Sequence, residues 1–459
     1  MFEVVSLVEH VPRLSGELKQ RVALAGAGSA RALCGVAHVA EAEAEADRKD
    51  RFWMPNTLDA IDLFAGLADP YPLYRGLREQ NDGVHFVEPV GMWLVLRYAD
   101  GQRLASERRR WSSNYFNSMG MGTYTAGDPE HERYSRIMSR NLMMNDAPDH
   151  TRLRKLLNHA FTGRATHAWD AVISDIVDSV LDGVVPCEPI DAFRDLGEVI
   201  PLMVIAKLLG VPVDDRERFR DLSVSFASTL DPGNIGEARD TAIRSSLELF
   251  DLVGGLADRA EREPQEGLLG ALVSAEEEDA TALSRDELVA QVCMLLAAGN
   301  ETTADLIATG TALLLEHSAQ LELLRENRSL LEPALHEILR YKSPLQFSPR
   351  VTAEDIDDLG PKTIPRGSHV LFGHGSANRD PRQYDRPEEF DITRGDRRHL
   401  AFASGAHFCI GNQLALTEGK IYFSKFLDRF GAMEAAGDPV PRCRFQQHGY
   451  ASVPLVVTE

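Results

Sequence analysis

Apolar positions recur at helical spacing along most of the chain from about Asp69 onward, and short apolar runs interrupt this pattern. Two of these runs, Trp93–Leu96 and His369–Phe372, lie between Gly and Pro residues and are typical of short strands. The pattern therefore predicts a mainly α-helical fold with small auxiliary β-sheets.

One predicted helix is long and buried. Ser284-Arg-Asp-Glu287 is typical of a capping box, and the following residues remain apolar almost all round as far as Leu315. The stretch Ala298-Gly-Asn-Glu-Thr-Thr303 interrupts this apolar pattern. A glycine inside a helix costs about 1 kcal/mol relative to alanine, and an unpaired buried carboxylate costs more. We interpret the stretch as a functional site; the alternative is a packing contact relieved by Gly299, with Glu301 reaching solvent.

The first 55 residues differ from the rest of the chain. A stretch of small residues is followed by an acidic run from Glu41 to Asp47, which predicts an N-terminal extension that is helical or disordered. Gly26 and Gly28 lack the third glycine of a nucleotide-binding loop, so we assign them no function. Residues 56–459 are expected to form the main domain.

Composition and charge exclude several classes of protein. The chain has 459 residues, of which 44% are hydrophobic and 26% charged, values typical of a soluble globular protein. Its formal net charge of -21 argues against a nucleic-acid partner, because phosphate binding needs clustered Lys and Arg. No apolar run is long enough for a membrane span. The five cysteines contain no Cys-x-x-Cys pair, which argues against a zinc knuckle or a disulfide framework, and we expect a cytoplasmic protein.

The strongest chemical signal is Phe402-Ala-Ser-Gly405-Ala-His407-Phe-Cys409-Ile-Gly411, which precedes another helical pattern. Cys409 thus falls at a helix N-terminus, where the helix dipole favours a thiolate. Gly405 and Gly411 allow unusual backbone torsions and close approach of the main chain to a flat ligand. A lone cysteine is usually an inert buried residue, but the whole decapeptide indicates a metal-bound thiolate.

The chain resembles the cytochrome P450 superfamily, the haem-thiolate monooxygenases, and most closely its soluble bacterial members. The resemblance runs from about Asp69 to the C-terminus. It implies the P450 fold, in which haem b (iron protoporphyrin IX) lies between a long central helix and the cysteine loop, so that residues 56–459 would be a haem-thiolate catalytic domain. Four motifs agree with it in order and spacing: Asp149-His-Thr-Arg-Leu-Arg154, the Ala298–Thr303 stretch, the pair Glu337 and Arg340, and the cysteine decapeptide.

The resemblance also implies roles for individual residues. Cys409 would be the axial ligand that pushes electron density onto the iron and favours cleavage of the oxygen–oxygen bond. Thr302 and Glu301 would deliver protons to bound oxygen, and His150, Arg154, Arg350 and His407 would bind the haem propionates. The implied cofactor-binding set is His150, Arg154, Ala298, Gly299, Arg350, Phe402, His407 and Gly411. Glu337, Arg340 and Arg394 would form a structural network behind the haem.

Two residues depart from the family pattern. Ala403 stands where a glycine is common, and Leu416 stands where an arginine is common on the helix after the cysteine. The first would tighten the loop. The second would remove a positive charge from the docking face for an electron donor.

The implied activity is a monooxygenase reaction that hydroxylates or epoxidises a small, largely apolar molecule, an intermediate of secondary metabolism. Dioxygen would be the cosubstrate. A ferredoxin-type electron donor and its reductase are expected, since the sequence contains no flavin or iron–sulfur module. Two alternatives stay open: an oxidative ring-closing or coupling enzyme on the same haem, and a non-catalytic haem sensor or ligand carrier.

Four regions are expected to line the substrate pocket. The first, Trp111 to Asp146, is rich in methionine, which serves either as core filler or as a pliable ligand wall. Its methionines are Met119, Met121, Met138, Met143 and Met144. The other three regions are Ile200 to Phe250, the helix face near Leu295 and Ala298, and Leu345 to Pro349.

Overall fold

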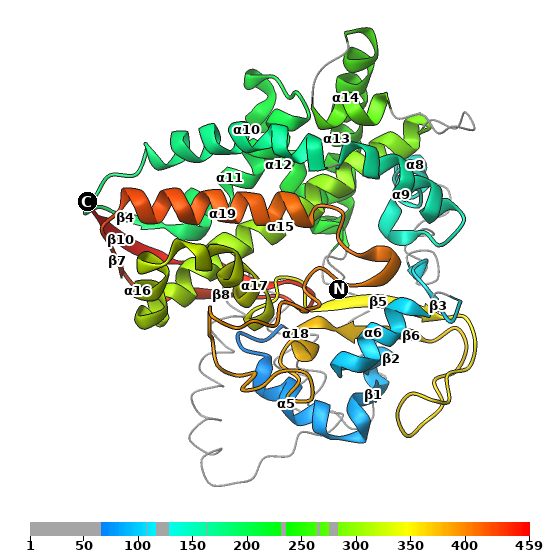
Figure 1. Ribbon diagram of the computed structural model, residues 1–459. Coiled ribbons are helices and arrows are strands. Elements are labelled where there is room, and N and C mark those ends of the chain that lie inside the picture. Colours follow the sequence, from blue (N-terminus) through cyan, green and yellow to red (C-terminus); the bar gives the residue numbers. More distant parts are fainter. Residues whose placement is uncertain are drawn as a thin grey trace.

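The fold is seen in a computed structural model (Figure 1). The structure describes residues 66–107, 109–115, 128–161, 163–230, 236–263, 267–274 and 283–459. The expected extension at residues 1–55, with Gly26 and Gly28, lies outside the described residues, as do Met119 and Met121. The division into an extension and a main domain therefore stays a prediction.

Helices dominate the described residues, as the apolar spacing predicts. The α-helices are α5 (Tyr71–Glu79), α6 (Tyr98–Ser106), α8 (Pro129–Met138), α9 (Asp149–Ala160), α10 (Gly163–Leu181), α11 (Val199–Leu208), α12 (Arg216–Ser228), α13 (Glu237–Arg262), α14 (Leu268–Val273), α15 (Arg285–Glu316), α16 (Ser318–Glu326), α17 (Leu331–Tyr341), α18 (His374–Ala377) and α19 (Asn412–Arg429). Within the described ranges, no helix combines the length and apolarity that crossing a bilayer requires.

Strands form three small sheets. They are β1 (Val84–Val87), β2 (Met92–Val95), β3 (Trp111–Ser112), β4 (Pro189–Asp191), β5 (Phe347–Thr352), β6 (His369–Gly373), β7 (Ala432–Ala435), β8 (Val440–Cys443), β9 (His448–Ser452) and β10 (Pro454–Thr458). The sheet orders are β1-β2-β6-β5-β3, β4-β10-β7 and β8-β9. The two strands expected from the sequence are β2 and β6, which are parallel neighbours with Trp93 opposite Val370. The mainly α-helical fold with auxiliary sheets is confirmed.

The molecule has a helical part and a sheet-containing part. Figure 1 shows α8 to α15 gathered on one side, while the five-stranded sheet lies on the other side with α5, α6 and α18. Helix α19 crosses the face of the molecule in front of α15. The segment that carries Cys409 leads into α19 and therefore joins the two parts.

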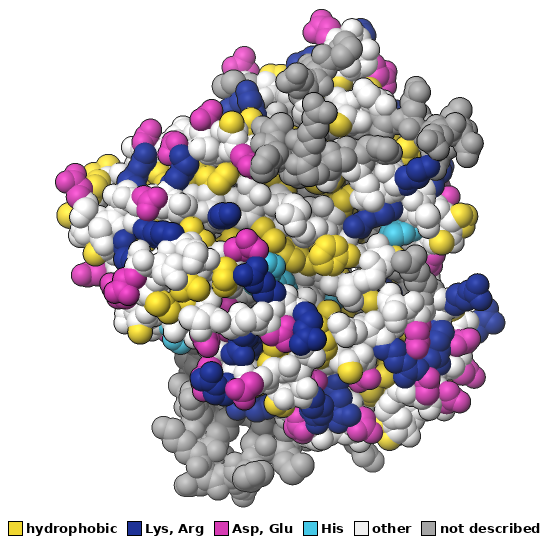
Figure 2. Space-filling view, viewed as in Figure 1, with side chains coloured by type: hydrophobic (Ala, Val, Ile, Leu, Met, Phe, Trp, Pro, Cys, Tyr) yellow, Lys and Arg dark blue, Asp and Glu magenta, His cyan; other side chains and the backbone are white. Residues whose placement is uncertain are grey.

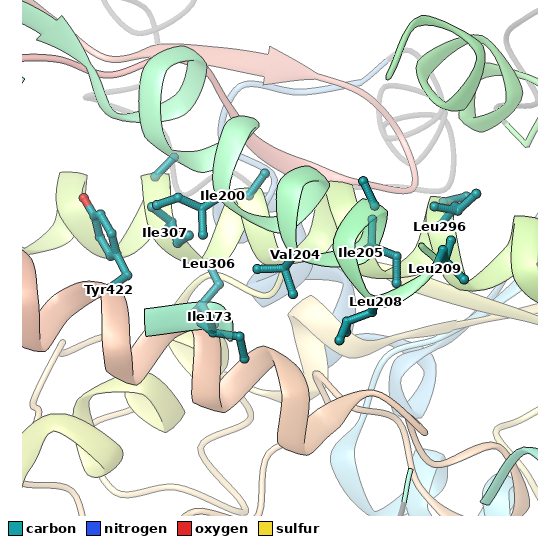
Figure 3. Close-up of a cluster of buried hydrophobic side chains, with 14 of the residues drawn as sticks. Ile173, Ile200, Val204, Ile205, Leu208, Leu209, Leu296, Leu306, Ile307 and Tyr422 are labelled. Carbon is teal, nitrogen blue, oxygen red and sulfur yellow. The ribbon is translucent and has the colours of Figure 1, made fainter. Parts of the chain in front are cut away.

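Helix α15 forms the centre of the hydrophobic core. Its capping box is confirmed, because Ser284 Oγ accepts from the Glu287 N–H and the Glu287 carboxylate accepts from the Ser284 N–H at 2.8 Å. Apolar side chains of α10, α11, α15 and α19 pack together in this core (Figure 3). The core residues labelled in Figure 3 are Ile173, Ile200, Val204, Ile205, Leu208, Leu209, Leu296, Leu306, Ile307 and Tyr422. A single π-helical turn, η4 (Ala192–Gly197), packs closely against α15. A Cβ on Gly197 would lie only 2.9 Å from the Ala304 carbonyl oxygen of that helix.

The described methionines of the 111–146 region divide between core and surface. Met138 and Met144 are buried in the hydrophobic core, so core filling accounts for them. Met143 is 44% exposed on the surface. The interpretation as a pliable ligand wall therefore rests on methionines outside the described residues.

Candidate functional site

Cys409 lies in a short loop between η7 (Gly405–His407), a single 3₁₀ turn, and the N-terminus of α19. Its backbone N–H donates to the Phe402 carbonyl at 2.9 Å, and Asn412 Nδ2 donates to the Cys409 carbonyl at 2.7 Å. These bonds close the loop from both sides. The prediction that the cysteine falls at a helix N-terminus is confirmed.

The charge of the Cys409 sulfur depends on opposing effects. Burial raises the pKa of the thiol, whereas the Gly411 backbone N–H and the Arg154 guanidinium lower it. Burial has the largest effect, so the helix end by itself does not ionise the thiol. A bound metal cation would supply the remaining stabilisation of a thiolate.

Two residues of the cysteine loop adopt left-handed backbone conformations. Gly405 has φ +68°, and a Cβ there would lie 2.2 Å from the Ala105 carbonyl oxygen, so both the torsion and the packing require glycine. Ala403 has φ +55°, a conformation that is strained for alanine. The positive φ is a physical reason why glycine is common at this position in the family that the chain resembles. Gly411 has an ordinary φ of -87°, so the unusual torsion expected there is wrong.

The centre of α15 is accessible although both of its flanks are buried. Ala298 and Gly299 are exposed, whereas the helix on either side of residues 298–302 contributes to the core. A Cβ on Gly299 would meet no atom within 4 Å, and the same holds for Gly411. Gly299 is therefore not needed to make room for a neighbouring element. Open space lies beside the backbone at both glycines.

The two candidate proton donors on α15 are held in different ways. Thr302 Oγ1 donates to the Ala298 carbonyl oxygen at 2.6 Å. The Glu301 carboxylate accepts from Arg442 at 2.9 Å and from Arg444 at 2.5 Å. From the sequence, Glu301 is expected either as an unpaired buried carboxylate or as one that reaches solvent. Both descriptions are wrong, because the side chain is 17% exposed and paired with two arginines.

Basic side chains from three separate elements meet at one cavity, which Asp146 also lines. His150 of α9, Arg350 of β5 and His407 of η7 line a space of about 460 Å³, together with the exposed Arg109. The His150 and His407 rings lie 4.1 Å apart, and Ser113 Oγ lies 2.9 Å from His407 Nε2.

Arg154 and Phe402, the other two side chains predicted to bind the cofactor, lie near the cysteine rather than along this cavity. Arg154 follows His150 by one turn of α9 and is near enough to Cys409 to lower the pKa of its thiol. Burial lowers the pKa of both Arg154 and Arg350. Partly buried guanidinium groups of this kind are stabilised by hydrogen-bonded anionic partners. The Phe402 ring packs near that of Phe408, with centroids 6.4 Å apart.

These residues fit the haem that the resemblance implies. A single buried thiol can bind the iron, and the arginine and histidine donors of the cavity beside it suit two propionates. Within the described ranges, no cluster of three or more His, Cys, Asp or Glu residues is arranged to hold a metal ion by itself. A lone thiolate matches an iron whose other ligands come from a macrocycle.

Glu337 and Arg340, one turn apart on α17, form a buried ion pair. Two N–H groups of Arg340 donate to the carboxylate at 2.7 and 2.8 Å, and the side chains are only 2% and 1% exposed. Arg394 Nε lies 3.1 Å from the same carboxylate, which also accepts the Asp391 N–H at 2.9 Å. The other Arg340 donors reach the carbonyls of Asn378, Pro387 and Glu389. The expected three-membered network is confirmed, and it ties α17 to the segment before the cysteine loop.

Two charged residues near the centre of α15, Asp305 and Arg442, were not predicted from the sequence. Asp305 lies one turn after Glu301 and is completely buried, and Arg442 of β8 pairs with both carboxylates. An acidic residue four positions after Glu301 on a buried helix was the available signal. Leu416 is half-buried and packs against the core, and its expected effect on donor docking stays a prediction.

Known proteins provide an independent comparison. The family model described as Cytochrome P450 matches residues 256–454. The chain is 37% identical to "Vitamin D(3) 25-hydroxylase" of Pseudonocardia autotrophica over 375 residues, which cover 80% of this chain and 89% of the relative. It is 36% identical to "6-deoxyerythronolide B hydroxylase" of Saccharopolyspora erythraea, with coverages of 81% and 91%.

Solved structures agree with these matches. The crystal structure of P450BioI in complex with an acyl carrier protein ligated with hexadec-9Z-enoic acid has a TM-score of 0.78 and 30% identity. The match covers 85% of this chain and 98% of that one. The chain therefore belongs to the cytochrome P450 family, and it is a monooxygenase whose haem b is bound through a cysteine thiolate.

Proposed function

We propose that this P450 hydroxylates or epoxidises a small, largely apolar intermediate of secondary metabolism. The observation that carries the proposal is the exposed Ala298–Gly299 stretch in the middle of an otherwise buried helix. Leu295, one turn earlier, is only partly buried, so an apolar side chain adjoins the accessible stretch, whose polar members are Asn300, Glu301 and Thr302. An apolar surface beside few polar groups is typical of a site for an apolar ligand.

The same proposal assigns Cys409 as the iron ligand and the cavity lined by His150, Arg350 and His407 as the propionate site. His150, Arg154, Arg350 and His407 would neutralise the propionates, while Phe402, Gly411, Ala298 and Gly299 would lie against the macrocycle. When bound, haem supplies the activation of dioxygen with electrons from outside. The chain's own residues hold the cofactor, exclude water and deliver protons.

Thr302 and Glu301 are the proposed acid relay. Thr302 Oγ1 now donates to the Ala298 carbonyl, so rotation about its side-chain bond would free the hydroxyl to donate elsewhere. Glu301 would resupply that proton from the outer side of the helix, where Arg444 is 44% exposed. A hydroxyl backed by a carboxylic acid is an ordinary general-acid arrangement.

We propose a ferredoxin-type electron donor with its own reductase. Phe408, directly before Cys409, is 40% exposed, so the cysteine loop reaches the surface. On the face that α19 crosses, hydrophobic side chains form a band bordered by charges of both signs (Figure 2). A small acidic or apolar partner could dock there close to the sulfur. We further propose that the enzyme works in the cytoplasm, where the reducing environment would keep the Cys409 thiol available to the iron.

Spectral titration of the purified haem protein tests the substrate class. The compounds follow the relatives' names: a sterol-like polycycle, a macrolactone and a long-chain fatty acid. Binding that displaces water from the iron shifts the haem absorption band. At least one compound should produce that shift and yield a product carrying one added oxygen atom. A ring-closed product without added oxygen would replace hydroxylation with oxidative coupling.

Thr302→Ala tests the relay separately from substrate choice. With ferredoxin, reductase and NADPH, the variant should consume NADPH but form several-fold less product per electron pair, because the removed hydroxyl no longer donates to oxygen. Thr309→Ala, on the same helix but buried in the core, is the matched control. Full coupling in Thr302→Ala would refute the relay.

A further inference from the structure

Asp305 and Arg442 form a buried pair next to the proposed proton donor. Asp305 lies one turn after Glu301 on α15 and is 0% exposed. Arg442 reaches in from β8 and donates through Nη2 to Asp305 and through Nη1 to Glu301 at 2.9 Å. A single guanidinium therefore bridges two carboxylates on the same face of α15.

The surroundings confine this pair tightly. A Cβ on Gly449 of β9 would lie 2.1 Å from Asp305 Oδ1, so only glycine leaves room for the carboxylate. The Arg442 guanidinium lies 5.1 Å from the ring centroid of Phe193 in η4. The Asp305 carboxylate therefore cannot move toward β9 without repacking that strand, so a change in pairing has to come from Arg442 or Glu301.

Polar atoms of the pair nevertheless lack partners. Asp305 Oδ2 and Arg442 Nε are buried and make no hydrogen bond with any described residue. Leaving a buried polar atom unpaired is costly, and in natural proteins such exceptions tend to mark functional positions.

The charges around Asp305 are closely balanced. The groups that face it are Arg442, Glu301 and Arg444, and Glu198 lies close to Arg442 and Glu301. Burial raises the pKa of Asp305 to about 7, although Arg442 opposes that effect. Burial also raises the pKa of Glu198. Asp305 therefore gains or loses its proton within the neutral range.

We propose that Asp305 and Arg442 are positioning residues for Glu301, in which Asp305 competes with Glu301 for the one shared guanidinium. The inference rests on the proposed role of Glu301. When Asp305 is ionised, it draws Arg442 toward itself and Glu301 is held less firmly. When Asp305 is protonated, Arg442 binds Glu301 alone and restrains it from moving toward Thr302.

The proposal has a definite pH consequence. Raising the pH from 6 to 8 ionises Asp305 and weakens the contact between Arg442 and Glu301, which leaves Arg444 as the main partner of Glu301 and should increase the product formed per NADPH. Asp305→Asn keeps the shape of the side chain but fixes it in the neutral state. That variant should lose roughly three- to tenfold in coupling at pH 8 and show a flat pH profile of coupling. An unchanged coupling and pH profile would overturn the proposal.

Two other variants separate positioning from folding. Gly449→Ala keeps every charge but forces the Asp305 carboxylate from its place, so it should also lower coupling at pH 8. Arg444→Gln removes the more exposed partner of Glu301 and leaves the Asp305–Arg442 pair, so its coupling should still depend on pH, with the midpoint moved upward because Arg444 lowers the pKa of Asp305. Equal loss of that dependence in Arg444→Gln would show that the effect is general electrostatics and would refute the role of Asp305.

A spectroscopic test does not depend on the proposed function. Infrared difference spectra of the wild-type haem protein between pH 5 and 9 should contain a carboxylic-acid band that titrates near neutral pH and disappears in Asp305→Asn. Absence of that band would overturn the proposal whether or not a substrate is found. Failure of the wild-type enzyme to oxidise any substrate would instead refute the proposed function.

Discussion

Two buried clusters of carboxylates and arginines differ in how completely their polar atoms are paired. The α17 cluster consists of Glu337, Arg340 and Arg394. All five N–H groups of Arg340 have acceptors there, and the Glu337 carboxylate also accepts hydrogen bonds from Arg394 and from the Asp391 backbone N–H. The α15 cluster consists of Glu301, Asp305 and Arg442. Asp305 and Arg442 each have a buried polar atom without a hydrogen bond to any described residue.

The difference separates a structural network from one suited to change. A fully paired network loses several bonds whenever one member moves, so it holds its segment in one arrangement. A shared, incompletely paired guanidinium can pass from one carboxylate to the other at lower cost. The α17 cluster therefore suits holding the cysteine loop, and the α15 cluster suits adjusting Glu301.

The largest expected effect comes from breaking the complete network. Glu337→Gln leaves Arg340 buried with its charge unpaired, which should reduce the free energy of unfolding by about 3–5 kcal/mol. Chemical denaturation followed by circular dichroism would measure the loss, and the yield of haem-loaded protein should fall with it. A change below about 1 kcal/mol would mean that the network does not hold the fold.

Glu418 extends the comparison to a buried carboxylate with no cation. It is 3% exposed, makes no ion pair with a described residue, and burial raises its pKa to about 8. Its folded-state pKa lies above the unfolded value of 4.5, so the folded protein retains a proton that the unfolded chain releases. Stability from this group is present below pH 4.5 and is lost as the pH rises through 8.

Glu418→Gln removes the loss of stability at high pH, because glutamine cannot ionise. The variant should be more stable than the wild type by a few kcal/mol at pH 8, with a smaller gain at pH 5. Denaturation midpoints at the two pH values measure the difference. The interpretation of Glu418 as an uncompensated acid fails if the gain does not increase with pH.

A smaller effect is expected inside the loop that the α17 network supports. Ala403→Gly should stabilise the protein by about 1 kcal/mol, because glycine adopts φ +55° without strain. Ala401→Gly, two residues earlier and without a positive φ, is the matched control and should be neutral or destabilising. Thermal unfolding of both variants would compare them. Destabilisation by Ala403→Gly would indicate that the methyl group contributes more by packing than its torsion costs.

The smallest effect is expected at an exposed pair with the same two-pronged geometry. Glu79 accepts from Arg382 at 2.8 and 2.9 Å, but the side chains are 51% and 44% exposed. Glu79→Gln should cost less than about 1 kcal/mol, because water screens the pair and solvates the arginine left behind. Matching losses in Glu79→Gln and Glu337→Gln would remove burial as the reason for the contrast.

Several features were predictable because they depend on neighbours along the chain. The capping box at Ser284, the length of α15 and the place of Cys409 before α19 follow from local pattern, and the structure has all three. The same local reasoning went wrong at Gly411, whose torsion is ordinary.

By itself the sequence determined the class of fold, the thiol at a helix end and the family resemblance, since periodicity and closely spaced motifs are properties of short segments. Only the tertiary structure decided that Glu337 and Arg340 are buried and that Glu301 is paired. It alone brought Arg442 to Asp305 from a strand 137 positions away. Burial and pairing set the charge of an ionisable group, and both arise where distant segments pack together.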